Sequence, residues 1–158
     1  ELAAGFDLAH FGAAPTKFDV DDLYPLTARI LAAQDLSVVA NAVRAAGVPD
    51  HLAPLFWQVT RENITTLHDL AGWWDLCRDG ATPLVDEEDR AFVAEAFAIL
   101  PEPPYGPEAW STWTNAVKEA TGRKGKTLFM PLRKAVTGRA RGPEMADLMQ
   151  LLQKKPTL

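Results

Sequence analysis

The sequence has little of several residue types, and each scarcity excludes a class of structure or chemistry. A single cysteine, Cys77, excludes an internal disulfide framework. The three histidines, His10, His51 and His68, lie far apart and form no zinc-spaced ligand set. No apolar run approaches the roughly 20 residues that cross a bilayer, and the start of the chain lacks the basic and apolar blocks of a signal peptide. These features predict a cytoplasmic protein with no metal site and no membrane association.

The net charge of −5 conceals an uneven distribution. Residues 1–110 carry six Lys or Arg against eighteen Asp or Glu, whereas residues 111–158 carry ten against three. A concentrated basic segment in an acidic chain indicates a polyanionic partner for that segment. Charge alone leaves open the alternative that these cations form a solvated surface.

Helical periodicity dominates the sequence, and no alternating strand pattern occurs. Five or six helices are predicted before residue 101 and three after it, within the periodic segments 18–34, 36–47, 51–63, 65–80, 85–100, 107–122, 129–138 and 143–153. Asp19, Thr65 or Thr66, and Asp86 are expected as N-caps. The fifth helix should bury a stripe formed by Phe92, Ala96 and Ile99.

The segment "PEPPYGP", residues 101–107, contains four prolines and a glycine and marks the clearest boundary in the chain. It predicts a division into a first helical subdomain, residues 1–100, and a C-terminal helical subdomain, residues 101–158. The expected fold is therefore all-α, with two small helical subdomains.

No pattern predicts a catalytic centre. Neither a P-loop nor a strand-linked dinucleotide motif occurs. Cys77 shares an apolar helical stripe with Trp74, which is typical of a buried structural thiol and not of a nucleophile. The acids of residues 86–89 lie at a helix start, where the positive end of the helix dipole accounts for them.

Two basic turns, "RKGK" at 123–126 and "RARG" at 139–142, flank a short predicted helix. If the surrounding helices form a hairpin, these cations converge on one surface. Basic turns next to helix N-termini suit phosphate groups, because backbone amides and side-chain cations act on the ligand together.

The run "GRKGKTLFMPLRKAVTGRARGPEMADLMQLL" resembles a signature of bacterial glutamyl-tRNA synthetases, the class I glutamate–tRNA ligases, in which G-x-K-G-K-x-L-F-x-P-L-R-x-A-L-T-G precedes G-P-E. "APTKFDVDDLYPLTARIL", residues 14–31, resembles more loosely the segment that opens the helical region of that family. The two class I catalytic signatures, H-I-G-H and K-M-S-K-S, do not occur in this chain.

The resemblance implies the anticodon-binding C-terminal region of such an enzyme, with the helical bundle of that family. The ATP, the Mg²⁺ and the attachment of glutamate belong to a catalytic domain outside this chain, so the chain alone should need no cofactor and should not aminoacylate. The implied partner is tRNA(Glu), with tRNA(Gln) as a second candidate, and the chain is expected to be monomeric.

The resemblance also implies site residues. Its motif makes five residues candidates for contacts with anticodon bases: Arg133, Gly142, Pro143, Met145 and Ala146. Arg61, in "TRENITTL" outside the motif, is a candidate for a further base contact from the first subdomain. Phosphate contacts are expected from five others: Arg123, Lys124, Lys126, Arg139 and Arg141. These assignments agree with the rule that sequence-specific RNA recognition targets unstacked loop bases, while phosphate contacts position the RNA. The alternative is a helical protein-interaction module whose basic tail binds an acidic partner.

Overall fold

Within residues 23–158, the part of the chain that the computed structural model describes, the backbone forms helices and no strands. The α-helices are α1 (Leu23–Ala32), α2 (Leu36–Ala45), α3 (Ala53–Thr60), α4 (Asp69–Asp79), α5 (Arg90–Ala98), α6 (Ala109–Thr121), α7 (Lys126–Thr137) and α8 (Met145–Met149). Two 3₁₀ turns, η4 (Arg61–Asn63) and η5 (Glu87–Asp89), extend α3 and precede α5. The predicted all-α class is confirmed, and the cap expected at Asp19 lies outside the described residues.

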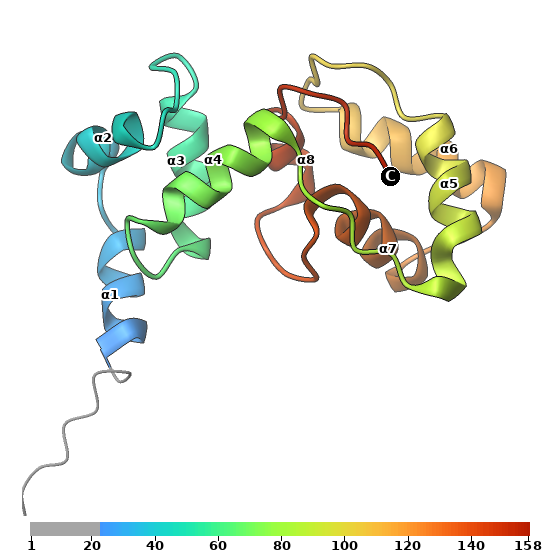
Figure 1. Cartoon of the computed structure of the whole chain (residues 1–158), viewed down its shortest axis with the longest axis horizontal. Helices are drawn as coiled ribbons and strands as arrows, with labels where there is room; N and C mark the ends of the chain where they lie inside the picture. The colour runs from blue at the N-terminus through green and yellow to red at the C-terminus, as the bar shows by residue number, and fades with distance from the viewer. Residues whose placement is uncertain (1–22) are drawn as a thin grey trace, which may run out of the picture.

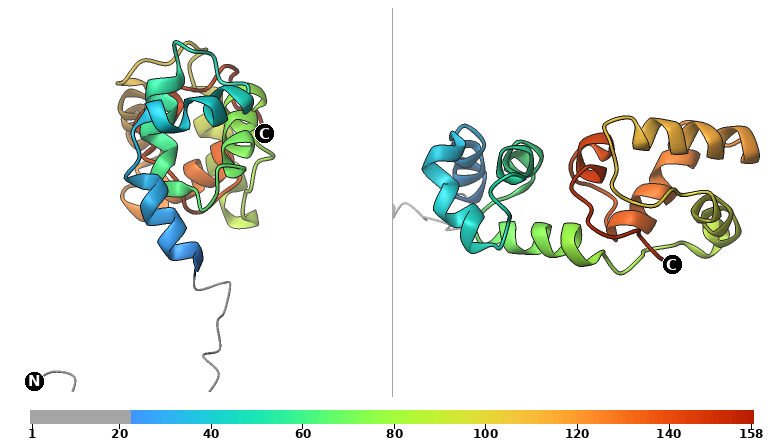
Figure 2. Two further views of the ribbon diagram at one scale, coloured as in Figure 1. Left: turned by 90° about the vertical axis from the view of Figure 1, so that its left-hand side faces the viewer. Right: turned by 90° about the horizontal axis from the view of Figure 1, so that it is seen from above.

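The helices form an elongated molecule in which α4 and α8 occupy the middle. Helices α1 to α3 lie at one end and α5 to α7 at the other (Figure 1). Seen from above, α4 extends from the first group towards the second (Figure 2). Contacts between α3 and α8 also join the two groups, so that segments far apart in sequence meet at the centre of the molecule.

Buried tryptophans connect the helices by hydrogen bonds as well as by packing. Trp57 Nε1 donates to the Gln34 carbonyl at 2.9 Å, and Trp113 Nε1 donates to the Ala96 carbonyl at 2.9 Å. Each indole therefore buries a large apolar surface and still satisfies its N–H group, as buried tryptophans require. Trp113 also meets Phe97 edge to face, with ring centroids 5.7 Å apart, which attaches α6 to α5.

The proline-rich segment 101–107 connects α5 to α6, and Tyr105 fixes it by donating its hydroxyl to the Pro101 carbonyl at 3.0 Å. Helix α5, which precedes this segment, packs against α6 and α7, which follow it. A division of the chain at residue 101 remains a prediction. In space, the link between the two groups of helices is residues 80–89, between α4 and α5 (Figure 1).

Helix α7 differs from its prediction because it begins at Lys126, so that Pro131 lies inside the helix instead of near its start. Proline has no N–H group, and the carbonyl four residues earlier, that of Thr127, therefore lacks its usual helical donor. Arg123 supplies a donor, since its Nη1 lies 3.3 Å from this carbonyl oxygen. The turn before the helix thus compensates for the proline within it.

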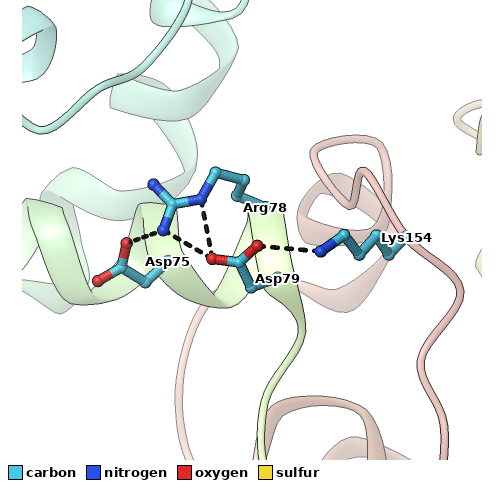
Figure 3. Close-up of polar contacts among 4 residues, drawn as sticks. All are labelled: Asp75, Arg78, Asp79 and Lys154. Atoms are coloured by element: carbon cyan, nitrogen blue, oxygen red, sulfur yellow. Dashed lines mark hydrogen bonds and ion pairs between the residues drawn. The ribbon is translucent and has the colours of Figure 1, made fainter.

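The last helix is shorter than predicted. It begins at Met145, not at Pro143, because Glu144 has extended backbone angles and its carboxylate accepts from the Met145 N–H at 3.2 Å. After α8 the chain turns back along α4, where the Gln153 N–H donates to the Cys77 carbonyl at 2.8 Å. Lys154 reaches Asp79 at 3.1 Å, beside the ion pairs that Arg78 makes with Asp75 and Asp79 (Figure 3). These contacts hold residues 150–155 on the middle of the molecule.

The predicted N-cap of α4 is wrong. Neither Thr65 nor Thr66 caps α4 with its hydroxyl; instead their backbone N–H groups donate to the Asp69 carboxylate at 2.8 and 2.9 Å. Asp86 occupies the predicted N-cap position, in front of η5, with extended backbone angles. Its carboxylate makes no capping hydrogen bond and instead pairs with Lys134 of α7 at 2.7 Å.

The predicted buried stripe of the fifth helix is also partly wrong. Phe92 and Ala96 are buried, but Ile99 is 45% exposed because α5 ends at Ala98 and the chain changes direction there.

Candidate nucleic-acid interface

The fold brings the predicted base-contacting residues of two distant segments to one cavity. Arg61 of η4 and the turn that leads into α8 both line a cavity of about 270 Å³. Pro143, Glu144 and Asp147 contribute from the turn and the helix, and Glu62 and Asn63 from η4. The two segments are about eighty residues apart in the sequence, and they line the same cavity because α3 packs on α8.

Carboxylates give this cavity a preference for base edges over phosphates. Glu62, Glu144 and Asp147 line it together with one cation, Arg61. Carboxylates repel phosphate groups but accept hydrogen bonds from exocyclic amino groups of bases, whereas an arginine donates to base oxygens and ring nitrogens. The lining therefore offers both donors and acceptors to an unstacked base.

Arg133 lies directly beneath the same turn. Its Nη1 donates to the Pro143 carbonyl at 2.9 Å, which fixes the guanidinium against the start of α8. Beside it, Trp110, Phe129, Glu144 and Met145 complete a second pocket of about 180 Å³. Phe129 is 44% exposed, and its ring lies 6.3 Å from that of Trp110, centroid to centroid. An exposed aromatic ring beside a fixed arginine is a surface on which a base can stack.

The turn of residues 142–146 offers mainly its backbone. Pro143 is buried, the Met145 side chain is only 2% exposed, and Gly142 and Ala146 are half-buried. At these four residues a base therefore meets mainly main-chain groups, whereas Glu144 between them presents an exposed side chain to both cavities. The assignment of these four residues to base contacts remains a prediction, now confined to their main chain and to the Ala146 methyl group.

Two of the predicted phosphate-binding residues are engaged within the protein. Arg123 pairs with Asp89, and its guanidinium lies 4.0 Å from the centre of the Phe92 ring. Arg139 covers the Trp73 ring, with its Cζ atom 4.3 Å from the centroid. Arg123 in particular has a structural role, because one guanidinium meets a carboxylate, a ring and the Thr127 carbonyl.

Three other cations remain available. Lys124, Lys126 and Arg141 are exposed, and among residues 23–158 their side chains have no ion-pair or hydrogen-bond partner. The two basic turns lie at opposite ends of α7, whose twelve residues span about 18 Å. The expectation that these cations share one surface remains a prediction, and the exposed cations at the two ends of α7 lie about 18 Å apart along the helix.

The remaining reactive groups do not indicate catalysis. Burial raises the pKa of the Cys77 thiol to about 12, so the thiolate that a nucleophile needs is not formed near neutral pH. Over the described range, His, Cys, Asp and Glu side chains form no group of three or more that could hold a metal ion. No helix of residues 23–158 has the length and apolar character needed to span a membrane.

Sequence reasoning missed several aromatic residues that line these cavities or lie buried beside them. It placed Trp74 on the buried stripe of α4 but not Trp73, although both are 3% exposed. Residues three or four positions apart lie on the same face of a helix. Leu70 lies three residues before Trp73 and four before Trp74, so it indicated both tryptophans as buried positions. The aromatic pair Trp110 and Phe129 gave no comparable signal, because its members come from two helices.

The all-helical fold has two cavities between its helices, one lined by Arg61 and the other by Arg133, and comparison with known proteins identifies the class of domain. The model of the anticodon binding domain family matches residues 42–158, and the chain belongs to this family. It is 70% identical over 157 residues to glutamate–tRNA ligase 2 of Dinoroseobacter shibae, which covers 99% of this chain and 36% of that protein.

Other curated relatives agree with this identification. The chain is 68% identical over 153 residues to glutamate–tRNA ligase 1 of Ruegeria pomeroyi, covering 97% of this chain and 34% of that protein. It is 66% identical over 158 residues to glutamate–tRNA ligase 2 of Jannaschia sp., covering 100% and 35%. The resemblance found in the sequence is confirmed, and the chain spans about a third of the length of these relatives.

Proposed function

We propose that this chain binds the anticodon loop of tRNA(Glu) and reads its unstacked bases. The observation that carries the proposal is the cavity that Arg61 lines together with Pro143, Glu144 and Asp147. Arg133 is fixed next to this cavity by its hydrogen bond to the Pro143 carbonyl. These residues combine donors, acceptors and an adjacent aromatic surface, which is the chemistry that exposed base edges require.

The free cations support the same role from outside the cavities. Lys124, Lys126 and Arg141 are placed to meet phosphates on both sides of a bound loop, since they flank the 18 Å length of α7. Phosphate contacts of this kind add affinity without reading sequence.

In a longer protein of the length of its relatives, this recognition would serve a glutamate–tRNA ligase. The catalytic domain of that protein would bind ATP and Mg²⁺ and attach glutamate, and this chain would select the tRNA, acting as a monomer in the cytoplasm. The relatives are named as glutamate–tRNA ligases, and the chain aligns with them over nearly its whole length.

The test is a binding comparison at physiological salt with transcripts of tRNA(Glu), tRNA(Gln) and an unrelated tRNA. We expect tRNA(Glu) to bind tightest, and the value for tRNA(Gln) to show whether it is a second ligand. Arg133→Ala should cost about 1 to 3 kcal/mol with tRNA(Glu) and reduce the discrimination against other tRNAs. Equal binding of all three transcripts by the unaltered chain would refute the proposal.

Lys124→Ala is the matched control for Arg133→Ala. It removes an exposed cation without a protein partner, so it should weaken all tRNAs by a similar factor and leave their order unchanged. A protein-interaction module would instead retain one protein partner after ribonuclease treatment and show no preference among tRNAs.

A further inference from the structure

Trp73 joins the two walls of the cavity that contains Arg61. Its Nε1 donates to the Asn63 carbonyl at 3.2 Å, and Asn63 is the last residue of η4, the turn that carries Arg61. The far end of the same indole faces the turn before α8: a Cβ atom added at Gly142 would lie 3.0 Å from Trp73 Cη2. One rigid ring therefore spans the distance between the two segments.

Two further contacts fix the turn to this ring. Arg139 covers the indole, with its Cζ atom 4.3 Å from the ring centroid, which adds a cation–π attraction at the start of the turn. The added Cβ at Gly142 would also lie 3.6 Å from Arg133 Nη1, so Gly142 lies between Trp73 and Arg133. A continuous series of contacts thus runs from η4 through Trp73 and Gly142 to Arg133.

The close approach of Gly142 to the Trp73 indole fixes the distance between the ring and the turn before α8. Gly142 has a φ of +154°, which residues with a side chain rarely adopt, and a Cβ atom there, 3.0 Å from Trp73 Cη2, would force the indole or the turn to shift by a few tenths of an ångström. Trp73 itself is 3% exposed, so a bound RNA does not reach its ring. Any effect of Trp73 on RNA recognition must therefore pass through the residues that it holds.

We infer that Trp73 is a positioning residue that sets the separation of Arg61 from the turn of residues 142–146, and thereby the fit of the cavity to a base. The inference rests on the proposed function for its RNA readout, but the positioning itself is a property of the free protein. Both can be measured separately with the full chain.

Trp73→Phe is the informative variant, because phenylalanine keeps an aromatic ring in α4 but cannot donate to Asn63 or reach Gly142 equally far. Trp74→Phe is the matched control. Trp74 is the next residue of the same helix and is also 3% exposed, but its ring packs on Phe56, at 5.9 Å between centroids. Both variants remove the same atoms from the same core.

The first measurement is the ratio of affinities for tRNA(Glu) and for the same transcript with altered anticodon bases. Trp73→Phe should lower this ratio about three- to tenfold, because the base contacts lose their spacing while the phosphate contacts persist. Trp74→Phe should leave the ratio within about twofold of the unaltered chain. An unchanged ratio in Trp73→Phe, or an equal loss in Trp74→Phe, would overturn the inference.

The second measurement needs no RNA. Amide hydrogen exchange in the free chain should become faster in Trp73→Phe at residues 61–64 and 139–148 together, since one ring restrains both segments. Trp74→Phe should leave residues 139–148 unchanged. Exchange that rises in only one of the two segments would contradict the positioning role. If the unaltered chain shows no anticodon preference, the proposed function fails, and the exchange result still decides whether Trp73 couples the two walls.

Discussion

Gly138 closes α7 beside the backbone of residues 81–82, and its replacement tests how tightly these two segments pack. Its φ is +66°, and a Cβ atom added there would lie 2.6 Å from the Thr82 carbonyl oxygen. Gly122 closes α6 with nearly the same geometry, a φ of +72°, but nothing lies within 4 Å of its added Cβ. Alanine at the two positions therefore differs in its contacts with Ala81 and Thr82, of which only the one with the Thr82 carbonyl oxygen is a clash.

The expected free energies of unfolding follow from that difference. At both positions the left-handed conformation costs alanine about 1 to 2 kcal/mol, and the lower entropy of the unfolded chain offsets about 0.4 to 1 kcal/mol. Gly122→Ala should therefore lose about 1 kcal/mol. Gly138→Ala must also displace the segment around Thr82, and overpacking of this kind adds about 1 to 3 kcal/mol.

Urea unfolding of the two variants measures the difference. For a slope of about 2 kcal/mol per molar urea, an extra 2 kcal/mol lowers the midpoint of Gly138→Ala by about 1 M relative to Gly122→Ala. Equal midpoints would show that residues 80–86 yield to the methyl group, and would refute the view that this segment is fixed against the end of α7.

Two other predictions concern the charged groups. Arg123→Gln should destabilise the fold but change the salt dependence of tRNA binding little, because Arg123 contacts Asp89 and Phe92. Lys124→Gln should leave the stability unchanged and reduce the slope of the salt dependence by about one. The reverse pattern would contradict a structural role for Arg123 and a phosphate-binding role for Lys124. Burial raises the pKa of the Asp69 carboxyl, but hydrogen bonds from Thr66 and Thr65 outweigh burial and leave this pKa below the ordinary value of an aspartate. Asp69 therefore stabilises the fold above about pH 4, and this contribution is lost as the pH falls through the lowered pKa. Asp69→Ala should cost about 1 kcal/mol at pH 7, and its difference from the unaltered chain should narrow below pH 4; a constant difference in urea midpoints between pH 7 and pH 2 would contradict the reasoning.

Local signals predicted the helices well where a strong stop residue was present. Gly47, Gly122 and Gly138 all have positive φ and follow helix ends, as the sequence indicated. Prediction failed where a local rule competed with a distant partner. Pro131 lies inside α7 because Arg123 donates to the carbonyl that the proline leaves without a donor, and no local rule contains that contact.

The site residues show the same limit. The resemblance indicated Arg133, Gly142, Pro143, Met145 and Ala146 through the motif, and Arg61 outside it. In the structure, Arg61 and Pro143 line one cavity. Of the predicted phosphate ligands, Arg123 and Arg139 are engaged with side chains from α4, η5 and α5. Whether a cation is free depends on its three-dimensional neighbours, which spacing along the chain does not reveal.

The sequence by itself determined the helical class, the helix ends at glycines, the uneven charge and the family, because each of these depends on local geometry or on a contiguous motif. Only the tertiary structure decided which cations remain exposed, which residues share a cavity, and that Trp73 spans the gap between η4 and the turn before α8. The physical reason is that packing places residues such as Asn63, Trp73 and Gly142 within a few ångströms of one another across the chain. Their contacts arise from how whole helices pack, and no short stretch of sequence encodes that arrangement.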